Sequence, residues 1–190
     1  LPTKIIFISL LIIILYYVLN YNHYILPETF TNINKEIPKV IYKSNKVLPN
    51  EELKNIFQKT IKENPNFKLE FYTDKKCIEF IKKNFDKRTL RAFNTLIPGA
   101  YKADLFRYCI LFKKGGIWSD LSDDFLNPIE KIINFKKDTL VLVEDNPYQG
   151  IPGIQISMIA AKPHNLIFKK CIEEIIENCE NHNYRRSPLD

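Results

Sequence analysis

Glycine is scarce in this chain of 190 residues, with five glycines against eleven prolines. This composition excludes collagen-like chains and Gly/Ser linkers. Histidine and cysteine are also few. The three histidines do not cluster with the four cysteines and no C-x-x-C pair occurs, so a zinc site is not expected. We expect the cysteines to be buried free thiols: Cys77, Cys109, Cys171 and Cys179.

Long runs of one charge are missing as well. Lysine and arginine number 28 against 22 acidic residues, which gives a net charge of +6, but the lysines are scattered. No nucleic-acid-binding motif occurs either, so no nucleic-acid partner is expected. An apolar fraction of 45% is sufficient to bury a core, which excludes global disorder, and the length suits one ordinary domain.

One long apolar run does occur, near the N-terminus. Residues 5–19 are apolar apart from Ser9, and counting on to Tyr21 gives seventeen residues. That is the lower limit of about 17–25 residues for a membrane-spanning helix, with tyrosines at the headgroup level. A cleaved signal peptide is disfavoured because residues 16–30 contain no Ala, Gly or Ser. A buried core helix is the other alternative.

This interpretation predicts three parts: a signal-anchor transmembrane helix over 1–21, a stem over 22–36 and a catalytic domain over 37–190. Lys4 before the apolar run favours a cytosolic N-terminus, which predicts a single-pass type II membrane protein. The catalytic domain would then be lumenal, as in the Golgi or ER. Leu1 in place of Met, and the lack of a closing pattern before Asp190, predict a piece truncated at its ends.

Strand-like and helix-like segments alternate after the stem, which predicts an α/β domain around a mainly parallel sheet. Ligands bind beyond the carboxyl ends of the strands of such sheets. Asn50 and Asp74 are expected to cap helices, Pro163 and Asn165 to start a last helix, and Gly115-Gly116 to end one. The expected strands are 40–42, 69–72, one opening at 117–118, 140–143 and 154–161.

Two charged residues stand in an otherwise apolar helical segment, 103–112. Asp104 and Arg107 are three residues apart and can pair with each other. Burying charges is costly unless they are paired or bind a ligand. The alternative to a structural pair is therefore a helix face that presents a carboxylate and a guanidinium to a polar ligand.

An acidic segment, residues 120–124, follows the strand that begins at Ile117. Its three carboxylates repel each other unless a cation or solvent relieves them. In an extended chain Asp120, Ser122 and Asp124 point to one side and Asp123 to the other. Oxygen ligands here suit Mg²⁺ or Mn²⁺, particularly when a substrate diphosphate completes the shell. The alternative is an acidic turn before Pro128.

The order of these features resembles glycosyltransferase family 32, whose sugar-binding region contains a DXD motif. This family includes initiating and sphingolipid mannosyltransferases, with the clostridial toxin glucosyltransferases as more distant relatives. The family pattern is approximately A-x-x-S-D-x-x-R-Y-x-x-L-x-x-x-G-G-I-Y-x-D-x-D. The matching residues are Ala103-Asp104, Arg107-Tyr108, Leu111, Gly115-Gly116-Ile117-Trp118 and Asp120. Weaker matches lie at 37–41 and 159–163.

The resemblance implies a GT-A type nucleotide-diphospho-sugar transferase fold, a nucleotide-sugar donor, Mn²⁺ or Mg²⁺, and transfer with retention. The acceptor would be a glycan, lipid or protein. Asp104 and Arg107 would bind donor-sugar hydroxyls, and Asp120 would be the catalytic first carboxylate of the metal motif. Gly115, Gly116 and Trp118 would form the turn beside the nucleotide sugar.

The sequence departs from the family pattern where the second carboxylate is expected. Ser122 stands at that position, so the predicted metal ligands are Asp120, Ser122 and Asp124. Asp123 could replace Asp124 only if the chain turns. The donor sugar, the acceptor and the oligomeric state are not encoded in these motifs. Two other functions stay open: a metal-independent sugar-nucleotide-binding relative without activity, and a metal-dependent phosphohydrolase using Glu144-Asp145.

Overall fold

A computed structural model of the chain describes residues 36–148 and 151–183. The predicted anchor over 1–21, and the stem up to residue 35, lie outside the described residues. Within the described ranges, no helix has the length and apolarity needed to cross a membrane. The chain divides into two compact units: residues 36–143 together with 155–190, and residues 1–35 together with 144–154. The first unit holds the site described below.

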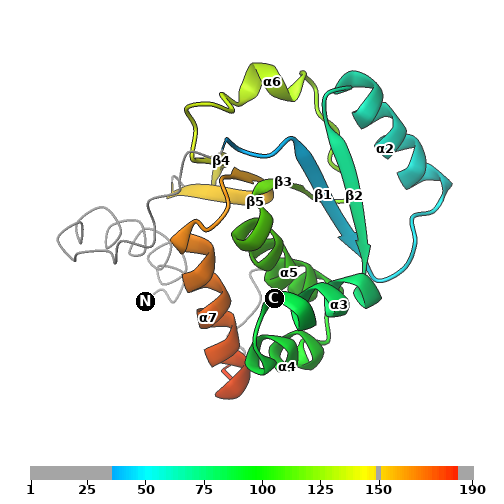
Figure 1. The fold of residues 1–190 in the computed structure, drawn as a ribbon. Helices are drawn as coiled ribbons and strands as arrows, with labels where there is room; N and C mark the ends of the chain where they lie inside the picture. The colour runs from blue at the N-terminus through cyan, green and yellow to red at the C-terminus, as the bar shows by residue number, and fades with distance from the viewer. Residues whose placement is uncertain (1–35, 149–150, 184–190) are drawn as a thin grey trace. The chain divides into compact units, whose positions relative to one another are not determined.

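Helices and strands alternate along the described chain, as predicted (Figure 1). In chain order they are β1 (Val40–Asn45), α2 (Glu51–Glu63), β2 (Lys68–Thr73), α3 (Asp74–Asn84), α4 (Lys87–Thr95), α5 (Gly99–Lys114), β3 (Gly116–Ser119), α6 (Ile129–Ile132), β4 (Leu140–Tyr148), β5 (Ile151–Ala161) and α7 (Leu166–Glu180).

The strands form one sheet with the order β2-β1-β3-β5-β4. β1 pairs in parallel with both β2 and β3, whereas β3 pairs antiparallel with β5. The predicted α/β class is confirmed, but the sheet is mixed: the parallel pairs are confined to the β2-β1-β3 half. The parallel half matters for the site because the carboxyl ends of its three strands meet at one edge.

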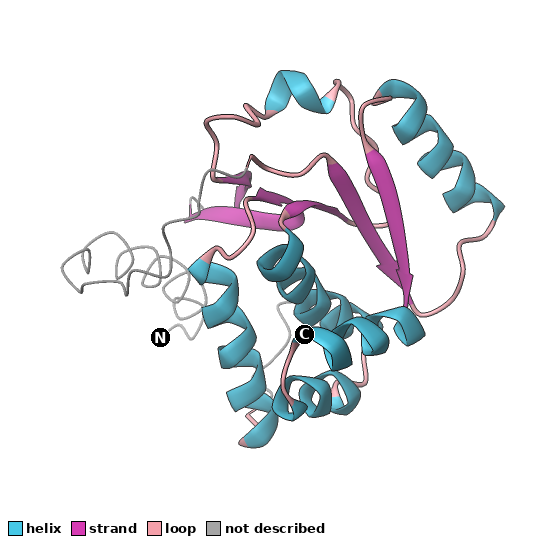
Figure 2. Cartoon of the chain, viewed as in Figure 1, coloured by secondary structure: helices cyan, strands magenta, loops and turns pink. Residues whose placement is uncertain are grey.

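Helices lie on both faces of the sheet (Figures 1 and 2). Alternating side chains of the central strands belong to two different cores. Tyr42, Trp118 and Ile159 face the larger core, which α3, α4, α5 and α7 cover. Ile41 and Ile117 face a smaller core that includes Ile129 of α6. This alternation is the period of two expected for strands that are buried on both faces.

Most of the predicted helix boundaries are confirmed by side-chain caps. Asn50 Oδ1 accepts from the backbone N–H of Leu53 at 3.0 Å, and Asn165 caps α7 in the same manner. The prediction for α3 was wrong by one residue, since Thr73 is its cap and Asp74 is its first residue. Helix α4, capped by Asp86, was not predicted. Glu144-Asp145 lie within β4, not after a strand, because β4 continues to Tyr148.

The glycine pair between α5 and β3 makes a turn that other residues could not make. Gly115 has a φ of 65° and a Cβ there would lie 2.6 Å from the backbone nitrogen of Pro163. Gly116 has a φ of 103° and a Cβ there would lie 2.8 Å from the ring of Tyr42. Positive φ and close approach are the two conditions that favour glycine. This turn brings the end of β3 back along α5.

Candidate active site

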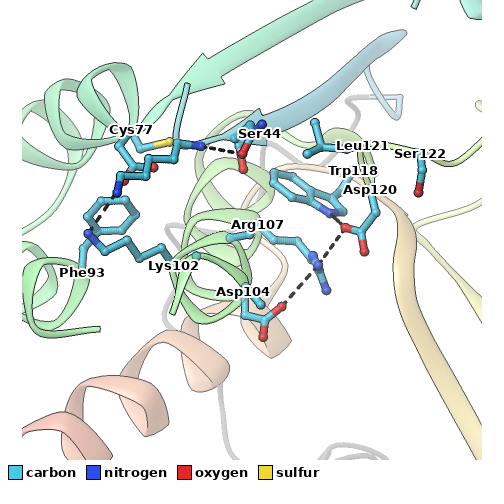
Figure 3. A pocket seen from close by; sticks show the side chains of 16 residues that line it. Ser44, Cys77, Phe93, Lys102, Asp104, Arg107, Trp118, Asp120, Leu121 and Ser122 are labelled. Atoms are coloured by element: carbon cyan, nitrogen blue, oxygen red, sulfur yellow. Dashed lines mark hydrogen bonds and ion pairs between the residues drawn. The ribbon is translucent and has the colours of Figure 1, made fainter. Parts of the chain in front are cut away.

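A pocket of about 440 Å³ opens at the carboxyl ends of β1, β2 and β3, where the sequence predicted a site. Its lining comes from the end of β1, the first residues of α3 and α5, and the chain that follows β3. The candidate residues that line it are Asp104, Arg107, Trp118, Asp120 and Ser122. Figure 3 shows the first four of these side chains converging on one another.

Arg107 lies at the centre of this group and is almost completely buried, with 3% of its side chain exposed. Its Nη2 lies 2.9 Å from Asp120 Oδ1 and 3.3 Å from Asp104 Oδ1. The guanidinium also lies over the Trp118 ring, 5.2 Å from the centroid. The predicted pairing of Asp104 with Arg107 is therefore present, but Asp120 is the nearer partner.

Two nitrogens of Arg107, Nε and Nη1, are buried and have no hydrogen-bond partner among residues 36–148 and 151–183. A buried donor without a partner costs about 1–3 kcal/mol, more when the group is charged. Such a cost is unusual in a protein interior and persists mainly where a ligand or water completes the site. Because Arg107 lines the pocket, these nitrogens mark it as a place for a polar ligand.

Asp120 is held in a fixed orientation by two donors on one of its oxygens. Oδ1 accepts from Arg107 Nη2 and from Trp118 Nε1, the latter at 2.8 Å. Within the described part of the chain, no hydrogen bond uses Oδ2, and the side chain is 42% exposed. Asp120 thus has one oxygen bound by the protein and a second oxygen available to a ligand.

The acidic segment turns immediately after Asp120, so the extended conformation considered from the sequence is not present. Asp123 N–H donates to the Asp120 carbonyl at 3.2 Å, and the Asp123 carboxylate accepts from the Asp120 N–H at 3.2 Å. Asp124 instead forms an ion pair with Lys59 of α2. Neither Asp123 nor Asp124 is among the pocket-lining residues, whereas Asp120 and Ser122 are.

Lys43 of β1 is a further residue beside the site that the sequence motifs did not predict. It is fully buried and donates to Ser119 Oγ at 3.0 Å, to the Asp120 carbonyl at 2.5 Å and to the Asp123 carbonyl at 3.3 Å. One pattern could have revealed it. Lys43 follows buried Ile41 at the period of two, which places a lysine on a buried strand face.

Burial and neighbouring charge alter the titration of these groups. Burial raises the pKa of Asp104, although Arg107 opposes this shift. Burial also raises the pKa of Asp123, to which the neighbouring carboxylate of Asp120 adds. Burial lowers the pKa of Lys43 to about 8, while the three carboxylates of the acidic segment oppose that shift. Perturbed groups gathered beside one pocket are typical of functional sites.

The donors at the pocket suit a divalent ion that is shared with a substrate. Across the described ranges, no group of three or more His, Cys, Asp or Glu residues could hold a metal ion by itself. Asp120 Oδ2 and the Ser122 hydroxyl nevertheless offer oxygen ligands at the pocket. Mg²⁺ is usually bound through one or two carboxylates, with waters and substrate phosphates completing its shell. This donor set fits that arrangement.

The four cysteines contribute no ligand cluster to this site. All are free thiols, with Cys77, Cys109 and Cys179 buried and Cys171 half-buried. Burial raises the pKa of the Cys77 and Cys109 thiols, which is expected of inert cysteines in a core. The prediction of buried free thiols is confirmed for three of the four.

Comparison with solved structures first defines the class of fold. The chain superposes on the PaToxG glycosyltransferase with a TM-score of 0.62 at 16% identity, covering 80% of this chain and 64% of that one. At this identity the likeness concerns the fold alone. It identifies the mixed α/β architecture as one that a glycosyltransferase also adopts.

Comparison of sequences then shows which family part of the chain is similar to. Residues 50–138 match the family described as "Glycosyltransferase sugar-binding region containing DXD motif". The matched region contains Asp104, Arg107 and the whole acidic segment. The resemblance predicted from the sequence is confirmed: residues 50–138 are similar to the sugar-binding region of these glycosyltransferases.

Three relatives by sequence have names that describe a glycosyltransferase or mannosyl transfer. An initiation-specific alpha-1,6-mannosyltransferase of Candida albicans is 29% identical over 131 residues, covering 64% of this chain and 33% of the relative. A mannosyl phosphorylinositol ceramide synthase of Saccharomyces cerevisiae is 27% identical, covering 73% and 35%. An uncharacterized glycosyltransferase of Acanthamoeba polyphaga mimivirus is 36% identical, covering 37% and 28%. The chain spans about a third of the length of these relatives.

Proposed function

We propose that this chain provides the donor-binding site of a metal-dependent glycosyltransferase with a GT-A type fold. The enzyme transfers a hexose from a nucleotide-diphosphate sugar to an acceptor, with retention of configuration. Mannose is the first candidate for that hexose because the names of two relatives describe mannosyl transfer. The acceptor is a glycan, a lipid or a protein.

The observation that carries this proposal is the state of Arg107. A buried guanidinium with two unpartnered nitrogens lines a pocket, inside the region that matches a sugar-binding family. Sugar hydroxyls are uncharged acceptors that can satisfy such donors without adding a further buried charge. The half-exposed carboxylate of Asp104 can accept from the same sugar, since 34% of its side chain is exposed.

Asp120 and Ser122 are proposed to hold the divalent ion, Mn²⁺ or Mg²⁺. A bound ion would neutralise charge on the diphosphate as the bond between the anomeric carbon and the phosphate oxygen breaks. Trp118 and Arg107 orient Asp120 for this role by binding its Oδ1. The Gly115-Gly116 turn fixes β3 against α5, so that these three side chains meet. Asp123 and Asp124 remain predicted ligands whose contribution is tested below.

The proposal includes a location that follows from the sequence alone. The apolar run at 5–19 supports an N-terminal signal anchor, and hence a type II membrane protein with a lumenal catalytic domain. Fusion of a glycosylation acceptor site to each end of the chain would test this topology. Modification at the C-terminal end alone is expected, and modification at the N-terminal end alone would contradict it.

An activity screen tests the proposed reaction directly. The full-length protein is mixed with Mn²⁺ and a panel of nucleotide sugars that includes GDP-mannose and UDP-glucose, with EDTA added to a parallel set. We expect one donor to be bound or consumed only when metal is present, with release of a nucleoside diphosphate. Failure of every donor to bind or to be hydrolysed would contradict the proposal.

The same screen separates the two other functions. Phosphate release without sugar transfer would indicate a phosphohydrolase. Donor binding that EDTA does not change, without turnover, would indicate a metal-independent binding relative.

A further inference from the structure

Lys43 of β1 is not among the residues proposed to bind the nucleotide sugar, yet it contacts Ser119, Asp120 and Asp123. Lys43 is fully buried, whereas lysines are almost never fully buried unless they are paired. The free-energy cost of burying its ammonium must therefore be offset by hydrogen bonds to the oxygens around it. Those oxygens all belong to Ser119, Asp120 and Asp123.

The contacts of Lys43 are with the backbone of the acidic segment more than with its carboxylates. Two of its three acceptors are carbonyls, those of Asp120 and Asp123, and the third is the Ser119 hydroxyl. These residues are separated from Lys43 by 76 to 80 positions in the chain. A single ammonium thus draws both ends of the turn from Asp120 to Asp123 toward one point.

We infer that Lys43 is a positioning residue that holds the Asp120 carboxylate toward Arg107 and the pocket. Asp120 and Asp123 are joined within the turn by reciprocal backbone and side-chain bonds, and the Asp120 N–H also donates to the Ser157 carbonyl of β5 at 2.9 Å. Of these bonds only the one from the Asp123 N–H, at 3.2 Å, reaches the Asp120 carbonyl, and Lys43 supplies a shorter contact to it at 2.5 Å. With Lys43 in place, the Asp120 carbonyl is fixed on one side of the chain. The carboxylate is then directed to the other side, where Arg107 and Trp118 bind it.

Lys59 provides a matched contrast on the same segment. It pairs with the Asp124 carboxylate but is 52% exposed and touches no backbone of the turn in the described chain. Exposed ion pairs contribute little to structure. Lys59 is therefore expected to leave Asp120 in place when it is removed, although both lysines neutralise the same acidic segment.

The indole of Trp118 reports the position of Asp120 without any assay of activity. It is the single tryptophan of the chain and it donates to Asp120 Oδ1. We expect the emission spectrum of Lys43→Met to shift toward that of Asp120→Ala, while far-UV circular dichroism stays unchanged. Adding Lys43→Met to Asp120→Ala should change the emission no further. Lys59→Met should keep the wild-type spectrum.

The inference is overturned if Lys43→Met keeps the wild-type emission, or if the two substitutions shift it independently. If Lys43→Met fails to fold, the emission spectrum of Lys43→Gln is compared in its place with those of the wild type and Asp120→Ala. Glutamine keeps a hydrogen-bond donor at shorter reach.

The consequence for ligand binding rests on the proposed function. We expect Lys43→Met to weaken metal-dependent binding of the donor identified in the screen by about 10–100-fold, as is typical when a group behind a metal ligand is removed. Unchanged affinity would count against Lys43. If the wild-type protein binds no donor at all, the proposed function fails, whereas the emission spectra still decide the role of Lys43.

Discussion

Two arginines of this protein each bind two carboxylates, and they differ in almost every other respect. Arg88 of α4 bridges to α7 through Glu173 and Glu180, and 38% of its side chain is exposed. Arg107 of α5 binds Asp104 and Asp120 with 3% exposed. Arg88 uses Nε, Nη1 and Nη2 in bonds of 2.6–2.9 Å, whereas Arg107 uses Nη2 alone.

The difference shows how a structural ion pair can be told from a functional one. Arg88 is satisfied by its own chain and lies at the surface, where an ion pair contributes little to stability. Arg107 is desolvated and incompletely satisfied, a condition that costs free energy in the absence of a ligand. Arg88 therefore links α4 to α7, whereas for Arg107 we propose ligand binding.

The largest expected effect follows the substitution Asp120→Asn. The amide keeps the shape but removes the charge that pairs with Arg107 and would bind the metal. We expect metal-dependent donor affinity to fall by about 100-fold or more, as for loss of one partner of a buried charge pair. Isothermal calorimetry with the donor and Mn²⁺ measures this, with circular dichroism as the control for folding. Wild-type affinity for metal and donor would show that Asp120 is not in the site.

Arg107→Lys and Arg88→Lys form a matched pair that tests the comparison itself. Lysine keeps the charge but cannot reproduce the fork of guanidinium donors. For Arg107→Lys we expect the affinity for the nucleotide-sugar donor to fall about tenfold or more, which is the scale of a hydrogen bond to a charged group. Arg88→Lys should leave donor affinity unchanged. Equal losses in both variants would mean that burial and unpartnered nitrogens do not distinguish the two arginines.

A smaller effect separates the two carboxylates after Ser122. Because the chain turns, Asp123 bonds back to the Asp120 N–H while Asp124 pairs with Lys59. We expect Asp123→Ala to weaken donor binding several-fold and Asp124→Ala to have little effect. Titration of both variants with Mn²⁺ and donor decides this. A larger loss for Asp124→Ala would favour the extended arrangement of Asp120, Ser122 and Asp124.

The smallest effects concern the pH dependence of stability. They have opposite signs for Glu180, which pairs with Arg88, and for Asp104, which pairs with Arg107. The hydrogen bond from Arg88 lowers the pKa of Glu180, so its contribution to stability is present above the ordinary value of 4.5 and is lost as the pH falls. Burial raises the pKa of Asp104, so its contribution is present at low pH and is lost as the pH rises.

Thermal unfolding of two variants from about pH 3 to about pH 7 measures these signs. Glu180→Gln should be less stable than the wild type near neutral pH and equal to it in acid. Asp104→Asn should gain stability relative to the wild type as the pH rises. The same slope in both variants would contradict the assignment of opposite shifts.

Much of the fold could be predicted because its signals are local. Asn50 and Asn165 are caps whose side chains bond within three residues, and the glycine pair marks a turn wherever it occurs. Helix α4 was not predicted because it is short, although Asp86 caps it and its buried residues Thr89, Ala92 and Phe93 recur at helical spacing. The antiparallel pairing of β5 also escaped, since strand direction depends on the path of the chain rather than on local pattern.

The candidate site, like the fold, could be predicted from the sequence only in part. Asp104, Arg107 and Asp120 could be predicted to act together because the family pattern preserves their spacing and the Gly115-Gly116 turn folds β3 against α5. The conformation of the acidic segment could not be predicted. Its turn contacts Lys43, about 80 residues away in the chain, and Ser157 of β5, and such tertiary contacts leave no periodic pattern near Asp120.

A crystal structure with Mn²⁺ and a nucleoside diphosphate would show whether this pocket binds the metal and the donor. We expect the metal on Asp120, the diphosphate beside it in the pocket, and a ligand or water atom bonded to Nε or Nη1 of Arg107. An empty pocket under these conditions, or the nucleotide bound away from Arg107 and Asp120, would contradict it.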